Sequence, residues 1–234
     1  MDRGPAGGQS SAATPGLVIR PYLPEDSVQA RRIFEAGMLE LVPAAFRRAS
    51  RSPANLGLLL AVSGAVYALT ASPALAGLSA LALLALVLLA CREAYAGYVR
   101  ETLRGDLADI EGRYLGGNQG GFWVAQAEGA GCLAGTVGAK PDPGDPTSCQ
   151  LMRLSVDRRY RHHGLGSRLT QTVLDFARTS GYHRCSLQTS DVQEPALRLY
   201  QRLGFRLVSS NRPPSAGLLI HLSNIRVCTL EKRL

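Results

Sequence analysis

The sequence predicts an α/β domain, with a mixed central sheet and flanking helices, that is interrupted by an apolar helical hairpin. Three observations carry this prediction. Short β-rich runs alternate with segments of helical periodicity from Leu17 onward. A span of 39 residues, Pro53–Cys91, holds no charged residue. The predicted strands Cys149–Val156 and Arg184–Gln188 are joined by one helix, so they should run parallel.

The chain divides by composition into a leader, a domain and an insert. The first sixteen residues are rich in Gly, Pro, Ser and Ala and contain no apolar core of a signal peptide, so they predict a disordered leader. The predicted boundaries are 1–16 for the leader, 17–52 for the first part of the domain, 53–91 for a membrane hairpin and 92–234 for the remainder.

The first part of the domain reads as a strand and a helix. Leu17–Arg20 has the composition of a short strand, and Pro24–Asp26 opens a helix with Ile33 and Phe34 near helical spacing. The helix leads directly into the apolar insert.

The insert is too long for one straight crossing of a bilayer. Its 39 residues would make about 58 Å of helix, roughly twice the hydrocarbon thickness. Pro73 interrupts the helical ladder and leaves apolar arms at Leu56–Ala71 and Ala74–Cys91. Arginines flank both ends, which favours a membrane hairpin whose ends share one side. The alternative is a buried hairpin of a soluble protein, and full crossing and re-entry both remain open.

A helix and a β-hairpin are expected next. Apolar residues recur every three or four positions from Tyr95 to Tyr114, and Gly116 should end that helix. Strands at Gly121–Gln126 and Cys132–Gly138 flank a glycine-rich turn. The proline-rich segment 140–147 is expected to be a loop.

The remaining elements complete the α/β pattern. The strand Cys149–Val156 leads through a glycine-rich turn into a helix from Leu165 that Gly181 ends. After the strand Arg184–Gln188, Pro195 suits the first turn of another helix. Two further strands are expected, one beginning at residues 205–208 and one within residues 218–230.

Composition narrows the functional classes. The 26 basic and 18 acidic residues give a formal net charge of +8, which suits an anionic ligand, nucleic acid or an anionic membrane surface. Basic and aromatic residues do not interleave as they do on nucleic-acid platforms, which argues against a nucleic-acid partner. The five cysteines are widely spaced and odd in number, so they are expected to be reduced thiols in a domain that faces the cytosol, without metal.

The turn before the helix from Leu165 has the chemistry of a phosphate site. A helix start leaves backbone N–H groups without partners and carries partial positive charge. Gly164 and Gly166 allow the backbone to approach a ligand closely, and Arg161 and Arg168 add positive charge. The spacing matches neither the P-loop nor the dinucleotide-binding glycine motif.

Two motifs in order resemble a known superfamily. Arg161-x-x-Gly164-x-Gly166 resembles the acetyl-coenzyme A signature of the GCN5-related N-acetyltransferases, and Ala196-x-x-x-Tyr200-x-x-x-Gly204-Phe205 resembles their second motif. The apolar hairpin between the first two helices, together with the sequences of residues 122–125, 135–139 and 174–182, is similar to the camello-like branch. Its members include membrane-bound cysteine S-conjugate and aspartate N-acetyltransferases. The resemblance covers residues 17–205 and implies an acyl-CoA N-acyltransferase type of fold.

The resemblance also implies a site and a reaction. Acetyl-CoA would be the co-substrate, and the amine of a small amino-acid-type acceptor would attack its thioester directly. Tyr200 would protonate the departing thiolate as general acid. Backbone groups of three strand residues would pair with the pantetheine arm, and the turn that follows would hold the pyrophosphate. These cofactor-binding residues are Leu154, Ser155, Val156, Arg161, His162, His163, Gly164, Leu165, Gly166, Ser167 and Arg168.

Several assignments stay open at this level. No acidic residue lies in Cys149–Val156, so the general base is a water chain or a residue such as Glu111 or Asp191. Cys185 is expected to be a buried thiol rather than a nucleophile. The rival functions are acetylation of protein lysines in the endoplasmic reticulum, or binding of acetyl-CoA or nucleic acid by an inactive homologue.

The hairpin constrains the topology. Both parts of the domain must meet in one sheet, so both arms should return to the same face of the membrane. The expected location is the endoplasmic reticulum, with the catalytic domain on the cytosolic side and a luminal domain as the alternative.

Overall fold

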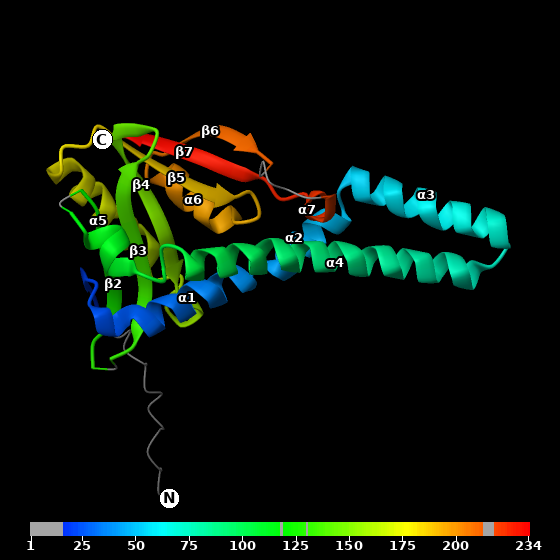
Figure 1. The fold of residues 1–234 in the computed structure, drawn as a ribbon, viewed down its shortest axis with the longest axis horizontal. Coiled ribbons are helices and arrows are strands. Elements are labelled where there is room, and N and C mark those ends of the chain that lie inside the picture. The colour runs from blue at the N-terminus through cyan, green and yellow to red at the C-terminus, as the bar shows by residue number, and fades with distance from the viewer. Residues whose placement is uncertain (1–15, 118, 130, 213–217) are drawn as a thin grey trace, which may run out of the picture.

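The computed structural model describes residues 16–234 except 118, 130 and 213–217, so the predicted leader lies almost wholly outside the described residues. A seven-stranded sheet has the order β1-β2-β3-β4-β5-β7-β6 (Figure 1). The β4–β5 pair is parallel and the other neighbouring pairs are antiparallel, which confirms the predicted mixed sheet. The strands are β1 Leu17–Pro21, β2 Gly121–Ala127, β3 Leu133–Asp142, β4 Asp145–Val156, β5 Arg184–Ser190, β6 Arg206–Asn211 and β7 Val227–Arg233.

Helices cover both faces of the sheet. On one face α1 and the last part of α4 enclose a core that includes Phe34, Tyr114 and Phe122. On the other face α5 and α6 enclose a core that includes Leu169 and Tyr200. The α-helices are α1 Ser27–Leu39, α2 Val42–Ser50, α3 Pro53–Thr70, α4 Pro73–Arg104, α5 Leu165–Thr179, α6 Glu194–Arg202 and α7 Leu218–Ser223, with short 3-10 helices at Pro24–Asp26 and Arg158–Tyr160 and a π-helix at Glu111–Leu115.

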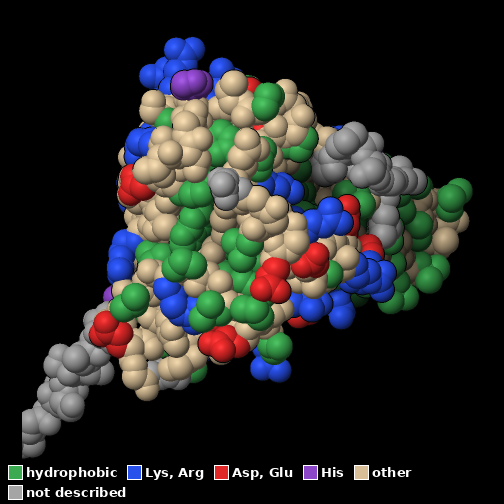
Figure 2. Space-filling model, turned by 60° about the vertical axis from the view of Figure 1, so that its left-hand side comes forward, with side chains coloured by type: hydrophobic (Ala, Val, Ile, Leu, Met, Phe, Trp, Pro, Cys, Tyr) green, Lys and Arg blue, Asp and Glu red, His purple; other side chains and the backbone are tan. Residues whose placement is uncertain are grey.

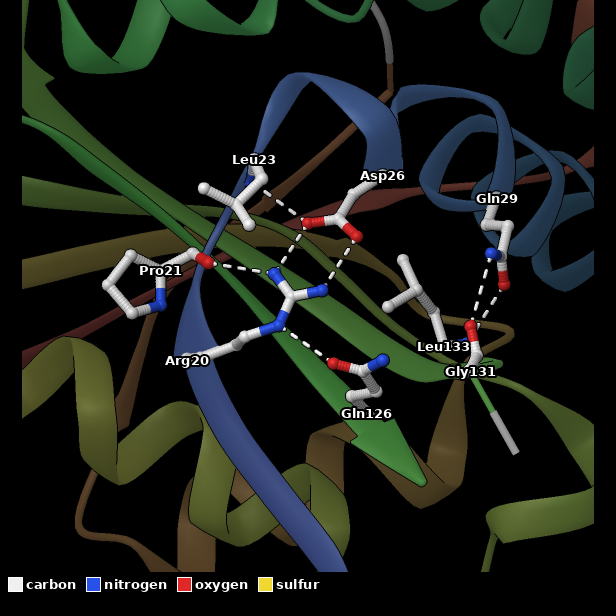
Figure 3. Close-up of polar contacts among 8 residues, drawn as sticks. All are labelled: Arg20, Pro21, Leu23, Asp26, Gln29, Gln126, Gly131 and Leu133. Atoms are coloured by element: carbon white, nitrogen blue, oxygen red, sulfur yellow. Dashed lines mark hydrogen bonds and ion pairs between the residues drawn. The ribbon is translucent and has the colours of Figure 1, made fainter. Parts of the chain in front are cut away.

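Buried polar contacts anchor the start of α1 to the sheet (Figure 3). Arg20 of β1 donates to both carboxylate oxygens of Asp26, at 2.7 and 2.9 Å, and to the side chain of Gln126 in β2 at 2.8 Å. One turn further along, Gln29 accepts a 2.9 Å hydrogen bond from the backbone of Leu133. Since an ion pair with a nearly buried carboxylate is held in one geometry, these bonds set the direction in which α1 crosses the sheet.

The apolar insert forms a helical hairpin that projects away from the sheet (Figure 1). Pro73 starts the second arm, as predicted, after Ala71 adopts a left-handed conformation with φ of 51°. Ser52 and Ser72 cap the two arms by accepting hydrogen bonds from backbone amides. No side chain of α3 is buried, and in α4 burial begins only at Val87.

The helix expected from Tyr95 to Tyr114 is wrong in both of its boundaries. It is the continuation of the second hairpin arm, and α4 ends at Arg104 before Gly105. Leu107, Ile110 and Tyr114 are nevertheless buried as the spacing suggested, because the turns and the π-helix that follow pack them into the same core. The regular spacing of these residues therefore indicates that they are buried, but it does not show that they belong to one continuous helix.

Two predictions about irregular and β segments also need correction. Segment 140–147 is not a loop, because β3 continues to Asp142 and β4 begins at Asp145, with Pro141 opposite Cys149. The strand expected within residues 218–230 forms as β7, but it begins only at Val227, after a short helix, α7, that the sequence does not predict. α7 contacts α2 and α4, and its Leu222 packs into the core at the base of the hairpin.

The parallel pair β4–β5 separates after four residues on each strand. Pairing runs from Ser148 opposite Arg184 to Leu151 opposite Leu187 and stops there. Directly beyond this point β4 carries a bulge against β3, where Arg153 has a φ of 55°. A bulge bends its strand and increases the local twist. The two strands consequently diverge, and the unpaired stretch between residues 152–156 and 188–190 is here called the β4–β5 gap.

Candidate functional site

The residues from Arg161 to Ser167, here called the glycine turn, lie between β4 and the N-terminus of α5. His162 and Gly164 have φ of 70° and 71°. Among the described residues, no protein acceptor receives a hydrogen bond from the six backbone N–H groups of residues 162–167, and the first helical bond runs from the Arg168 N–H to the Gly164 carbonyl. Six free amides at the positive end of a helix form an anion-binding surface.

The arginine side chains at the glycine turn and at the start of α5 bond to other parts of the protein, whereas the backbone amides of the turn do not. The Arg161 guanidinium donates to the Val156 carbonyl at 3.0 Å and pairs with Glu40 at 2.7 Å. Arg168 donates to the Leu17 carbonyl at 2.8 Å. His162 and His163 are exposed at the surface of the turn. The two arginines therefore hold the turn against α1 and β1, and the free backbone amides carry its capacity for an anion.

The end of β4 presents an open backbone edge beside the turn. Thr136 and Gly135 of β3 pair with Ser155 and Val156 on one edge of the strand. On the other edge, pairing with β5 has already ended at Leu151. Leu154, Ser155 and Val156 thus lie along the β4–β5 gap, where an extended ligand could add its own amides to the strand. The Ser155 hydroxyl is buried and has no hydrogen-bond partner among the described residues.

Tyr200 of α6 lies in the core below β5, with its ring 5.7 Å from that of Phe205 in an edge-on arrangement. The side chain is 5% exposed, and no described residue hydrogen-bonds to its hydroxyl. Burial and the neighbouring Cys185 thiol raise the pKa of Tyr200 well above its usual range. The hydroxyl therefore keeps its proton at neutral pH, as a general acid must.

Neither acidic residue named as a base lies free in the gap. Glu111 is exposed on the π-helix, on the α1 side of the sheet. Asp191 follows β5 directly, and Arg48 of α2 contacts it twice, at 2.7 Å to the carboxylate and at 2.8 Å to the carbonyl. Cys185 is fully buried, and its contact with Cys149 and its burial raise the pKa of its thiol. That thiol is unsuited to nucleophilic attack.

Sequence reasoning missed an ion pair under the bulge. Arg153 donates two 2.8 Å hydrogen bonds to Asp106, and its guanidinium lies 5.5 Å from the ring centre of Phe34. Tyr114 also donates to Asp106. Burial alone would raise the pKa of Asp106, but the bonds from Arg153 and Tyr114 lower it below its usual value. No sequence signal joins residues 47 positions apart, although an arginine in an otherwise apolar strand marks a buried partner.

A cavity of about 300 Å³ opens between α1 and the end of β4. Gly37 of α1 and Glu40, which caps that helix, line one side, and Val156, Arg158 and Arg161 line the other. The ion pair between Glu40 and Arg161 crosses its edge, so the end of α1 and the glycine turn are held together there.

Comparisons with known proteins agree with this geometry. Residues 88–205 match the model of the family described as "Acetyltransferase (GNAT) family". The chain is 39% identical over 192 residues to N-acetyltransferase 8B of Homo sapiens, covering 80% of this chain and 83% of that protein. It is 36% identical over 188 residues to "Probable N-acetyltransferase camello" of Xenopus tropicalis, covering 80% and 85%.

Solved structures support the fold. An acetyltransferase of the GNAT family from Staphylococcus aureus Mu50 superimposes with a TM-score of 0.53 at 17% identity, covering 94% of this chain and 99% of that one. At this identity the likeness concerns the arrangement of the sheet and helices alone.

Proposed function

Because the chain belongs to the GNAT acetyltransferase family, in its camello-like branch, and is an N-acetyltransferase that uses acetyl-CoA, we propose where its substrates bind and where it works. The protein is a membrane-anchored enzyme that moves the acetyl group of acetyl-CoA to the amine of a small amino-acid-type acceptor. The single observation that carries the site is the run of free amides from residue 162 to 167 beside the β4–β5 gap.

The cofactor positions follow from that observation. The free amides of the glycine turn bind the pyrophosphate of acetyl-CoA, where the helix dipole of α5 adds to their attraction. The open backbone edge of Leu154, Ser155 and Val156 pairs with the amides of the pantetheine arm. The thioester then lies in the β4–β5 gap, on the side of the sheet that carries Tyr200.

The reaction needs little covalent chemistry from the protein. The amine nitrogen attacks the thioester carbonyl carbon, the carbon–sulfur bond breaks, and the thiolate of CoA takes the proton of Tyr200. Water accepts the proton that the amine loses and returns one to the tyrosine. Positioning in the gap supplies most of the acceleration, since well-oriented reactants gain about 7–11 kcal/mol.

The hairpin supports membrane anchoring. Both arms are long and apolar enough to cross a bilayer, yet only 6% of the apolar window of α3 and 17% of that of α4 is buried. A core helix of a soluble protein would be mostly buried. In Figure 2 hydrophobic side chains cover the visible part of the hairpin at the right, whereas charged side chains are spread over the rest of that face. The 18 residues of α3 make about 27 Å of helix, close to the hydrocarbon thickness.

The topology supports a domain that lies on one side of that membrane. α2 enters the hairpin and α4 leaves it at the same end (Figure 1), so an even number of crossings returns the chain to its sheet. The domain faces the cytosol, where acetyl-CoA is made available, and the membrane is that of the endoplasmic reticulum. Protection of an epitope at either terminus from added protease in sealed microsomes would contradict this orientation.

Turnover tests the enzyme reaction. The full chain, purified in detergent, is expected to release free CoA thiol from acetyl-CoA with an amino acid or an S-substituted cysteine. Replacing Tyr200 with Phe should lower kcat about 100-fold or more, within the usual range for loss of a general acid, and leave acetyl-CoA binding unchanged. Acetylation of lysine peptides alone would overturn the proposed acceptor class. Equal kcat in both proteins would remove Tyr200 from the mechanism.

A further inference from the structure

The residues of β5 alternate between the two faces of the sheet. Cys185 and Leu187 point into the core beneath α5 and α6. Ser186, Gln188 and Ser190 point to the opposite face, because successive side chains of a strand alternate. The 3.2 Å hydrogen bond between Ser190 and Tyr95 of α4 places this row on the α4 side.

Only the middle residue of this row lacks a partner among the described residues. The Ser186 hydroxyl donates to Asp142 at 2.8 Å, and Ser190 is bonded to Tyr95. Gln188 lies between them, is exposed and makes no side-chain contact of this kind with the described part of the chain. β5 is an interior strand, between β4 and β7, and the exposure of Gln188 shows that this part of the sheet face is open.

The surroundings explain this exposure. Pairing with β4 ends at Leu187, directly before Gln188, so the β4–β5 gap opens beside it. Across the sheet Gln188 is opposite Thr229 of β7, which is opposite Ser209 of β6. Paired residues share a face, so these three side chains form a polar, uncharged floor beside the gap.

The two faces of the gap differ in what can reach them. The α5 side of the gap carries the core that contains Tyr200 and, at the start of α5, the free amides that are proposed above to hold the cofactor. A thioester held in the gap is therefore open to a second substrate from the face that carries Gln188.

We propose that Gln188 donates its side-chain amide to the α-carboxylate of the acceptor and so selects α-amino acids. The assignment rests on the function proposed above. An amine must be uncharged to attack, so the carboxylate is the constant charged group of such an acceptor. A hydrogen bond from an amide to that charge fixes the amine relative to the thioester.

Steady-state kinetics of the detergent-purified full chain test the assignment, with S-benzylcysteine and S-benzylcysteinamide as acceptors. Gln188→Leu should raise the KM for S-benzylcysteine about 10- to 100-fold, as expected for a lost bond to a charged group, and leave the KM for acetyl-CoA unchanged. Gln188→Glu should raise it further through repulsion between carboxylates. Against the carboxamide, which lacks the charge, wild type and Gln188→Leu should be equal.

Gln171→Leu is the matched control, because Gln171 lies on α5, on the opposite side of the sheet. An unchanged KM for S-benzylcysteine in Gln188→Leu, or a lower KM in Gln188→Glu, would overturn the assignment. So would an equal loss with the carboxamide. If the wild type acetylates neither amine although acetyl-CoA protects it from heat, the acceptor class proposed above fails together with this assignment. Absence of heat protection would instead refute the cofactor site.

Discussion

Gly164 offers the sharpest test of the glycine turn. Its φ of 71° lies in the left-handed region, and a Cβ built on it would meet no atom within 4 Å. Replacement with Ala therefore creates no clash, and its cost is the conformational strain of about 1–2 kcal/mol. If the turn relaxes to relieve that strain, its amides leave their common direction. The same energy then appears as a roughly 5- to 30-fold rise in the KM for acetyl-CoA.

Gly181 supplies the control at the other end of the same helix. It has a φ of 81°, and a Cβ on it would also meet nothing within 4 Å. Gly181→Ala should lower the Tm by a few degrees, as a change of about 1 kcal/mol does in a chain of this size, and Gly164→Ala should lower it less, because its turn relaxes. Only Gly164→Ala should weaken acetyl-CoA in kinetics and in thermal-shift titration. Equal affinity in the two variants would refute the argument that these amides bind the pyrophosphate.

Three further outcomes are expected. Asp106→Asn should destabilise the fold by about 3–5 kcal/mol in denaturant titration, because it leaves the guanidinium of Arg153 buried without its charge partner; a loss below about 1 kcal/mol would contradict this. Since the folded pKa of Asp106 is lowered, its contribution is fully present above the unfolded pKa of about 3.9 and is lost as the pH falls through the folded value. The Tm of the wild type should therefore fall more steeply in acid than that of Asp106→Asn, and parallel profiles would exclude the linkage. Tyr95→Phe removes the bond that joins α4 to Ser190 and should cost about 1 kcal/mol, measured by the same titration, whereas no change would mean that the bond is not formed in solution.

Sequence periodicity predicted which helices and strands form better than it predicted the residues at which they end. The strand at Leu17, the break at Pro73 and the helix from Leu165 are as expected, because each has a local cause in β-rich composition, a missing amide donor or a glycine-rich helix entry. Gly105 was overlooked as the end of α4, since burial kept the apolar spacing regular beyond it. The composition of residues 218–230 predicts a strand, which forms as β7, but it does not predict α7, because that helix depends on contacts with α2 and α4, far away in sequence.

The candidate site also contains some residues that the sequence predicts and others whose surroundings it does not predict. Arg161, Gly164 and Gly166 stand close together in the chain, so their motif could be recognised without a structure. The motif assigns Arg161 to the cofactor site, and the structure adds a partner that the sequence does not reveal, Glu40, over a hundred residues earlier. Gln188 carries no local signal, because its exposure depends on where β4 leaves β5.

By itself the sequence determined the succession of strands along the chain, the apolar hairpin and the glycine-rich entry to α5, since these follow from periodicity and from the backbone chemistry of proline and glycine. Only the tertiary structure decided where the parallel strands separate and which arginines are paired with groups of the protein. It also decided which polar side chain is exposed beside the gap. Those features depend on contacts between distant segments, and residues far apart in a sequence carry no mark of the partner that folding gives them.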